Sequence, residues 1–163
     1  KSSKLLGIKN IRFYRLPDNR LDQYHIIDVT KIIEKYISKN RPEIIFTHCG
    51  SDLNVDHRIV FQSTLTACRP MKGLSVKKIL SWENMSSTEW SSNKIGNQFS
   101  PNIYVDVSKT ISLKKEALSF YKDEMRPFPH PRSWEAIEAL AKFRGSNSGK
   151  LFAEAFELVR YCD

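Results

Sequence analysis

The residues best suited to chemistry lie in one short segment, HCGSDLNVDH, which spans residues 48 to 57. It holds two histidines, two aspartates and one asparagine, and Thr47 separates it from the apolar run EIIF at residues 43–46. Histidine and carboxylate side chains commonly bind zinc in hydrolases, where three protein ligands leave a fourth position for water. Water bound to zinc attacks a carbonyl group near neutral pH when a nearby carboxylate accepts its proton. The segment is therefore a candidate for part of a hydrolytic metal site.

Each polar residue of this segment also has a structural interpretation. Asp56 could cap the following helix or orient the neighbouring His57 ring. Asp52 and Asn54 could simply shape the turn. His48, at the end of the apolar run, could be a structural histidine. Spacing alone makes His57 a candidate metal ligand and leaves these alternatives open.

The elements predicted around the segment place it where ligands commonly bind. EIIFTH, residues 43–48, has no alternation of apolar and polar residues, which indicates a strand covered on both faces. Residues 56–69 are predicted to form the next helix, which Pro70 ends. The segment would then follow the carboxyl end of a strand, the usual position of ligands in open α/β sheets.

The rest of the chain alternates strands and helices, which is typical of an α/β fold with a mainly parallel sheet and flanking helices. The loop 83–101 is long enough to suggest a functional role. Gly7 is expected to end a first short helix. Further strands are predicted at 10–16, 76–82 and 102–107, and further helices at 25–40, 108–125 and 133–144, the last capped by Ser133 and ended by Gly145. Residues 153–159 could form a strand or a helix, and their alternation of apolar and polar residues favours a strand.

Composition narrows the function classes. The 163 residues suit a single domain, and no apolar run approaches the roughly 18 residues of a membrane span. A net charge of +8 permits an anionic partner, but there is no basic tract or nucleic-acid motif, so nucleic-acid binding is not expected. Cys49, Cys68 and Cys162 form no CxxC motif, which favours reduced thiols in a cytoplasmic protein.

Two separated segments resemble the PIG-L (LmbE-like) deacetylases. PEIIFTHCGSDLNVDHRIV, residues 42–60, is similar to the family's second signature, THH-x-x-DLN-x-DHR. MRPFPHPRSWEAIEALAKFRGSNSGKLFAEAF, residues 125–156, resembles the family's C-terminal segment, and PDNRLD, residues 17–22, also fits. The resemblance implies a Rossmann-like fold and zinc-dependent removal of acetyl groups from N-acetylated sugars, commonly N-acetylglucosamine units on a lipid, inositol or nucleotide carrier.

The resemblance also implies roles for individual residues. His57 would be the zinc-binding histidine, and Asp56 the acidic residue that holds a neighbouring imidazole or the loop. Asn54 stands where some members have a histidine that stabilises the oxyanion or protonates the amine. An asparagine can donate a hydrogen bond to an oxyanion but cannot act as an acid, so His48 becomes a candidate for that role.

Contacts to the substrate are expected from outside the segment. A structural ion pair is the alternative for each arginine, and core or rim packing is the alternative for the tryptophans that could form a sugar platform. The predicted sugar or carrier-phosphate contacts are Asp18, Arg20, His130, Arg132 and Arg144, and the tryptophans are Trp82, Trp90 and Trp134.

The family's first signature, His-Pro-Asp-Asp-Glu, does not occur in these 163 residues. In the family it supplies a zinc histidine, a zinc aspartate and the general-base aspartate, and we expect it upstream of Lys1. The chain would then be one N-terminally incomplete domain that lacks the first strand and helix of its sheet. Because one histidine cannot hold catalytic zinc, we expect the intact protein to be active and the chain alone to be inactive and zinc-poor. Uncovered strand edges would favour self-association into a homo-oligomer.

Two other functions stay open on the sequence. The first is a non-catalytic relative or fragment that binds a sugar or a partner, which the absent first signature supports. The second is a basic nucleotide- or nucleic-acid-binding module, which the net charge alone supports.

Overall fold

The computed structural model describes residues 1–163, which form two compact units. The first unit comprises residues 1–15 and 104–155, and the second comprises residues 16–103 and 156–163. The second unit contains the segment 48–57. The prediction of a single domain over 1–163 stays a prediction. No helix of either unit is long and apolar enough to cross a membrane.

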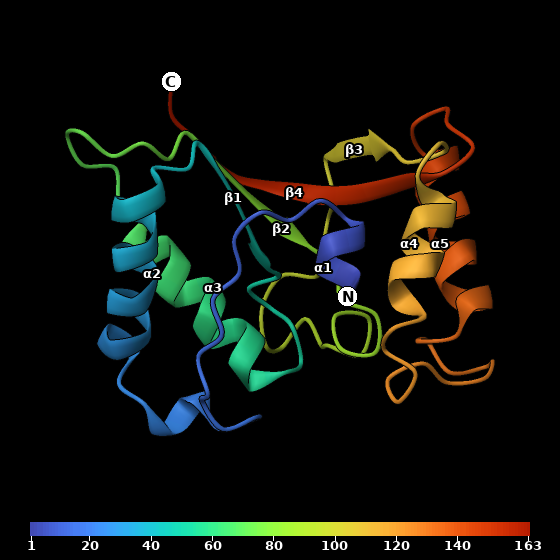
Figure 1. Ribbon diagram of the computed structural model, residues 1–163, viewed down its shortest axis with the longest axis horizontal. Coiled ribbons are helices and arrows are strands. Elements are labelled where there is room, and N and C mark those ends of the chain that lie inside the picture. The colour runs from blue at the N-terminus through green and yellow to red at the C-terminus, as the bar shows by residue number, and fades with distance from the viewer. The chain divides into compact units, whose positions relative to one another are not determined.

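The elements follow one another in an α/β order (Figure 1). The helices are α1 (Ser2–Leu5), the 3₁₀ turn η1 (Leu21–Gln23), α2 (Ile26–Asn40), α3 (Val55–Ala67), α4 (Ile111–Leu118) and α5 (Trp134–Ser146). The strands are β1 (Ile44–His48), β2 (Lys78–Trp82), β3 (Ile103–Asp106) and β4 (Ala153–Tyr161), hydrogen-bonded in the order β1-β2-β4-β3.

The sheet is mixed. β1 pairs with β2 in parallel, from Ile44 opposite Lys78 to His48 opposite Trp82. β2 pairs with β4 in antiparallel fashion, with Trp82 opposite Phe156. The α/β class is confirmed, whereas parallel pairing is limited to β1 and β2 because β4 enters beside β2 in the opposite direction. The parallel register brings His48 and Trp82 to the same end of the sheet.

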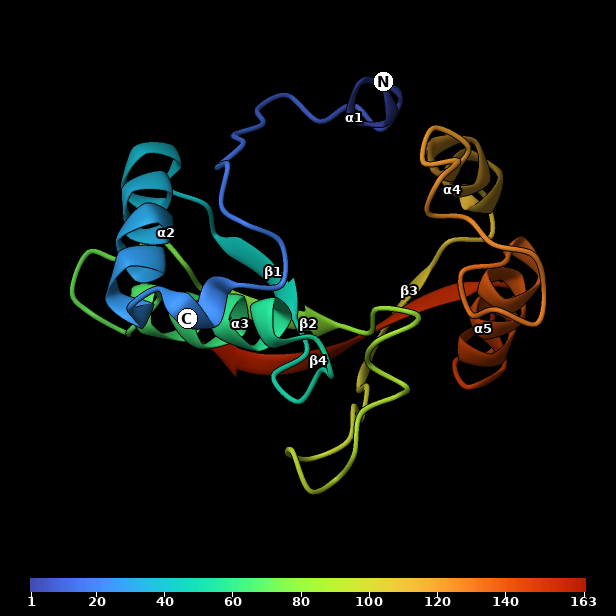
Figure 2. The ribbon, with the colours of Figure 1, turned by 90° about the horizontal axis from the view of Figure 1, so that it is seen from below.

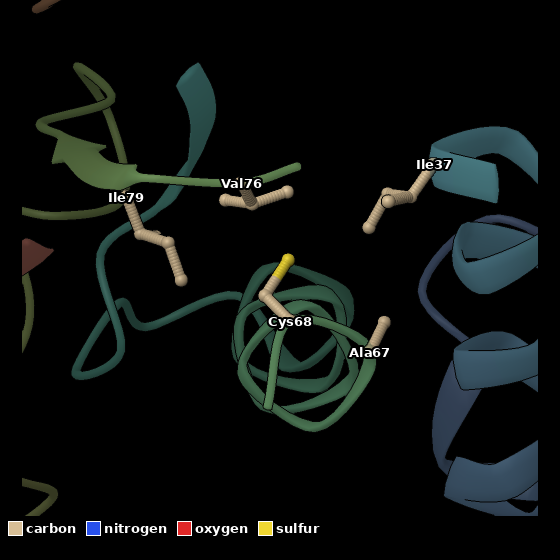
Figure 3. Close-up of a cluster of buried hydrophobic side chains, with 5 residues drawn as sticks. All are labelled: Ile37, Ala67, Cys68, Val76 and Ile79. Atoms are coloured by element: carbon tan, nitrogen blue, oxygen red, sulfur yellow. The ribbon is translucent and has the colours of Figure 1, made fainter. Parts of the chain in front are cut away.

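The core of the second unit forms between α2, α3 and β2. The helices α2 and α3 contact each other, and α3 contacts β1, as both views show (Figures 1 and 2). Five buried side chains converge here, namely Ile37, Ala67, Cys68, Val76 and Ile79 (Figure 3). Burial of such apolar side chains contributes about 25 cal/mol per Å², so this cluster fixes α3 against the sheet. Ala67 and Cys68 lie at the C-terminal end of α3, so this packing holds the end of the helix opposite to the candidate residues.

In the first unit, helix boundaries follow capping chemistry. Ser133 begins α5 as predicted, because its hydroxyl oxygen accepts the Ala136 N–H at 3.1 Å. The helix continues through Gly145 to Ser146 rather than ending at Gly145. A Cβ at Gly145 would lie 2.6 Å from the Lys150 carbonyl oxygen, so the glycine permits a close backbone approach.

Two predicted elements differ from the structure. No strand forms at residues 10–16, and Phe13 in this stretch is 86% exposed. β-branched and aromatic residues form a strand only when a neighbouring strand pairs with them. The helix predicted for 108–125 is shortened to α4. Beyond Leu118, the Ser119 hydroxyl donates to the Glu116 carbonyl and turns replace the helical hydrogen bonds.

Candidate functional site

The candidate site lies where β1 ends and α3 begins. His48 is the last residue of β1, and His57 is the third residue of α3. Their imidazole rings stack with centroids 3.9 Å apart and planes 1° from parallel. The Trp82 ring, at the end of β2, lies 4.8 Å from His48 at 54°. The two histidines of the segment are therefore neighbours, and an aromatic side chain packs beside them.

Asp52 is the most buried polar residue of the site, with no exposed surface. One carboxylate oxygen accepts hydrogen bonds from the Asn54 N–H at 2.9 Å and from the Ser87 hydroxyl, and lies 3.0 Å from His57 Nδ1. The other accepts from the Thr88 hydroxyl at 2.7 Å. Burial alone would raise the pKa of this carboxyl group, but the hydrogen bonds, His57 first, outweigh it and lower the pKa to about 2. Asp52 is thus an anion enclosed by donors.

His57 is oriented by this carboxylate. Its side chain is 19% exposed, and Nδ1 faces Asp52, so Nε2 is the nitrogen left outside the contact. A histidine that donates one ring N–H to a carboxylate and keeps the other nitrogen unprotonated has the usual arrangement of a metal ligand.

Asn54 is the N-terminal cap of α3. Its side-chain oxygen accepts the backbone N–H groups of Asp56 at 2.8 Å and His57 at 3.3 Å. The interpretation of Asp56 as the cap is therefore wrong, because Asp56 lies inside the first turn. The Asn54 amide nitrogen donates to the Asn19 side-chain oxygen at 2.9 Å, which occupies one of its two protons. The oxyanion role predicted for Asn54 stays a prediction.

Asp56 holds a second loop against the site. Its two carboxylate oxygens accept the backbone N–H groups of Asn19 at 2.8 Å and Leu21 at 2.9 Å. Asn19 has the left-handed φ of 53°, a conformation that asparagine tolerates well. Asp18 and Arg20 flank Asn19, so Asp56 fixes the backbone that carries both predicted substrate contacts. This loop is not the segment 48–57, so the catalytic role predicted for Asp56 stays a prediction.

The long loop after β2 contacts the candidate site. Glu89 accepts the backbone N–H groups of Ser86 at 2.6 Å and Ser87 at 3.2 Å, which fixes the turn. The Thr88 hydroxyl oxygen accepts the Asn84 N–H at 2.7 Å while it donates to Asp52. The loop therefore supplies two of the donors that surround the Asp52 carboxylate.

His48 has no hydrogen-bond partner on its buried Nδ1 atom. Burial, and then the neighbouring His57, lower the pKa of His48 to about 4, so its ring is neutral at pH 7. Because the stacked rings lie in parallel planes, one metal ion cannot lie in the plane of both. His48 and His57 therefore do not form a two-histidine ligand pair for the same ion.

The candidate site provides only part of the ligand set that a zinc ion requires. His57 has the chemistry of one ligand, but no group of three or more His, Cys, Asp or Glu side chains in residues 1–163 is arranged to hold a metal ion. Catalytic zinc requires three protein ligands. These residues alone do not form a complete zinc site, and no reaction step follows from them through a metal.

Of the other predicted contacts, Trp90 lies in the second unit and is 52% exposed, and the rest lie in the first unit. The site geometry does not test them. His130 Nδ1 accepts the Arg132 backbone N–H at 3.0 Å, and the Arg132 guanidinium pairs with Glu124. The Arg144 guanidinium lies 5.3 Å from the Phe143 ring centroid. The Trp134 ring lies under Lys115 Nζ at 4.8 Å. Substrate binding by these residues stays a prediction.

A separate pocket lies at the amino end of β2, beside Cys68, Val76, Ile79 and Arg160. The Arg160 guanidinium donates to the Cys68 carbonyl oxygen at 2.6 Å there. Trp82 ends β2 at the opposite end, so this pocket is not part of the histidine site. All three cysteines are free, and the buried Cys68 and the exposed Cys162 both line this pocket.

Sequence reasoning gave Asp52 only a role in the turn and gave no role to Ser87 or Thr88. The turn role is real, because Asp52 accepts the Asn54 N–H two residues on. The additional role depends on a contact with a loop 35 residues away, and the only sequence signal for it was the length of that loop.

The fold and the site describe an α/β protein with a carboxylate-held histidine at the carboxyl end of a strand. Residues 1–68 match the family model of PIG-L, described as GlcNAc-PI de-N-acetylase. That match includes β1, the segment 48–57 and α3. These residues carry a PIG-L family segment, and the family resemblance is confirmed over them.

Solved structures share the fold. The conserved protein TT1542 from Thermus thermophilus matches 99% of this chain and 71% of its own length, with TM-score 0.76 and 17% identity. N,N'-diacetylchitobiose deacetylase from Pyrococcus horikoshii matches 98% of this chain and 60% of its own, with TM-score 0.72 and 20% identity.

A third structure, the A40926 pseudoaglycone deacetylase Dbv21, matches 99% of this chain and 68% of its own length, with TM-score 0.70 and 17% identity. At these identities the likeness establishes the Rossmann-like fold. The chain spans between 60% and 71% of the three structures.

Proposed function

We propose that this chain is part of a hydrolase that removes the acetyl group from an N-acetylated sugar of the N-acetylglucosamine type. The observation that carries the proposal is the contact between Asp52 and His57 Nδ1, within a segment that matches the PIG-L family. Two of the structurally similar proteins are deacetylases, which supports the same reaction class. The substrate is a sugar attached to a carrier, and the protein acts in the cytoplasm.

In this proposal zinc would be the cofactor, and His57 would be one of its ligands through Nε2. The other ligands, and the general base, come from residues outside this sequence. When bound, zinc supplies activated water for amide hydrolysis. In that reaction the acetamide C–N bond breaks, the water oxygen remains with the acetate, and a proton goes to the sugar amine.

The residues of this chain orient the site. Asp52 holds His57, Asn54 fixes the start of α3, and Asp56 fixes the loop that carries Asp18 and Arg20. Asp18 and Arg20 contact the sugar hydroxyls or a carrier phosphate. The second amide proton of Asn54 is available to an oxyanion, and neutral His48 packs behind His57. His130, Arg132 and Arg144 contribute further substrate contacts.

The test compares the 163-residue chain with the product of the complete reading frame. Each is supplied with zinc and with N-acetylglucosamine or N,N'-diacetylchitobiose, and released acetate and free amine are both measured. We expect equimolar acetate and amine from the complete product, loss of both with a chelator, and neither from the chain alone. Activity of the chain alone, or zinc bound tightly to it, would overturn the assignment of ligands to other residues.

Histidine variants test the ligand assignment. His57→Ala in the complete product should abolish acetate release. His25→Ala is the matched control, because His25 is exposed in the same unit and makes no side-chain cap contact. Retained activity in His57→Ala would refute the role of His57.

A second candidate function is non-catalytic sugar binding. The absence of a three-ligand group from these residues favours it. Calorimetric titration with N,N'-diacetylchitobiose separates the two functions. Sugar binding without acetate release by the zinc-supplied complete product would support this second candidate and exclude the hydrolase.

A further inference from the structure

The carboxylate of Asp52 collects hydrogen bonds from two separate parts of the second unit. Asn54 donates from the segment 48–57, and Ser87 and Thr88 donate from the loop after β2. The Arg58 guanidinium also fixes the backbone of Asp52, because it donates a hydrogen bond to the Asp52 carbonyl oxygen at 2.7 Å. A buried anion with this many donors has one well-defined position, so the group facing it is also held in one position.

The contact with His57 sets which ring nitrogen carries a proton. Asp52 Oδ1 lies 3.0 Å from His57 Nδ1, a hydrogen-bond distance. If Nδ1 had no proton, its lone pair would face a carboxylate oxygen across that distance. Ser87 Oγ also lies 3.3 Å from Nδ1, but its single proton is directed to Asp52. Nδ1 is therefore the protonated nitrogen.

We propose that Asp52 is the positioning residue of the site and holds His57 in the Nδ1–H form, so that Nε2 is offered to a metal ion. This inference rests on the proposed function for the identity of the metal, whereas the hydrogen-bonded form of His57 belongs to the chain itself. Asp52, Ser87 and Thr88 form the positioning network, and they act only through His57.

Asp56 and His48, which also lie next to His57, do not hold its ring through a hydrogen bond. Both carboxylate oxygens of Asp56 accept backbone N–H groups of the loop that contains Asn19 and Leu21. The His48 ring faces His57 by stacking, which involves neither ring nitrogen of His57 in a hydrogen bond. Asp56, next to His57 in the sequence, therefore holds the loop that contains Asn19, whereas Asp52 holds the imidazole ring of His57.

The test is a long-range ¹H–¹⁵N correlation spectrum of the ¹⁵N-histidine-labelled 163-residue chain at pH 7.5. The four histidines are assigned by single substitutions. We expect His57 with Nδ1 protonated and Nε2 unprotonated. A His57 with its proton on Nε2, or on both nitrogens, would overturn the proposal without any variant.

Two matched substitutions then separate positioning from general loop support. Asp52→Asn should raise the population of the Nε2–H form, because a neutral amide oxygen is a weaker acceptor than a carboxylate. Asp56→Asn makes the same change on the adjacent carboxylate and should leave the His57 form unchanged. No change in Asp52→Asn, or an equal change in both, would contradict the assignment. If Asp52→Asn does not fold, the wild-type spectrum decides.

Zinc affinity of the complete reading-frame product gives a second readout, measured by competition with a chromophoric chelator. Asp52→Asn should weaken zinc binding by roughly 10–100-fold, the usual effect of losing a partner of a metal-bound histidine. If the complete product binds no zinc, the proposed function fails while the spectrum still tests Asp52. If zinc binds and Asp52→Asn leaves the affinity unchanged, the positioning role fails and the proposed function survives.

Discussion

The rings of His48 and His57 lie face to face, with centroids 3.9 Å apart and planes 1° from parallel. A metal ion bonds to a ring nitrogen in the plane of its ring, so this stacking gives the two histidines different roles. His57 faces a carboxylate through Nδ1, whereas the buried Nδ1 atom of His48 has no partner. His48 therefore packs against His57, and the proton-donor role predicted for His48 stays a prediction.

We expect the free energy of unfolding to fall as His48 becomes protonated. Burial first, and His57 second, lower the pKa of His48 from 6.5 to about 4. Between these values the unfolded chain binds more protons than the folded chain, so the free energy of unfolding decreases as the pH falls. It has its full value above pH 6.5 and decreases as the pH falls from 6.5 toward 4. The loss is on the order of 3 kcal/mol. Urea unfolding at several pH values between 7 and 4 measures it.

His48→Phe keeps an aromatic ring in the stack and cannot titrate, so its unfolding free energy should depend less on pH over the same range. His25→Phe, at an exposed histidine, should keep the wild-type dependence. Equal slopes for wild type and His48→Phe would show that His48 does not carry the effect.

Asp52→Ala should be strongly destabilising at pH 7. The change leaves the Thr88 and Ser87 hydroxyls, the Asn54 N–H and His57 Nδ1 without their acceptor. Each buried donor without a partner costs about 1–3 kcal/mol, and we expect a total loss of roughly 3 kcal/mol because water can reach part of the space. Urea unfolding checks this, with Asp18→Ala as the exposed control. A loss below about 1 kcal/mol would mean that the network contributes little.

The sequence was sufficient for the elements that rest on local patterns. The strand β1, the helix α2 and the Ser133 cap of α5 each depend on neighbouring residues, and all three were predicted correctly. The prediction that β1 is covered on both faces was wrong, because Ile44 is 48% exposed and Phe46 is 52% exposed. The strand expected at 10–16 failed because a strand needs a partner, which local composition does not supply. The antiparallel pairing of β4 with β2 likewise depends on contacts between segments that are distant in the sequence.

In the candidate site, too, only the features that depend on residues close in the sequence were predictable. The position of His57 at the start of α3 followed from the pattern of residues 48 to 57. The role of Asp52 did not, because its partners Ser87 and Thr88 are 35 and 36 residues away. A carboxylate adjacent to His57 in the sequence was the obvious choice to hold a ring, but a helix directs successive side chains to different faces.

Gly50→Ala should destabilise the second unit through a steric conflict. A Cβ at Gly50 would lie 2.5 Å from Phe61 Cε1, closer than carbon atoms can approach. The Phe61 ring can move, so we expect a loss of about 1–3 kcal/mol rather than complete unfolding. Phe61→Ala removes the conflicting atoms, and in a double-mutant cycle the cost of Gly50→Ala should fall toward zero. An unchanged cost in the Phe61→Ala background would place the conflict elsewhere.

Asn54→Ala should lower the free energy of unfolding by about 1 kcal/mol, because the backbone N–H groups of Asp56 and His57 lose their cap. Asn54→Ser is the matched variant. It restores a capping oxygen but, like alanine, lacks the amide that donates to Asn19. Most of the stability should return in Asn54→Ser, measured by urea unfolding at pH 7. If serine is as destabilising as alanine, the contribution of Asn54 comes from its bond to Asn19, and the cap at the start of α3 is dispensable.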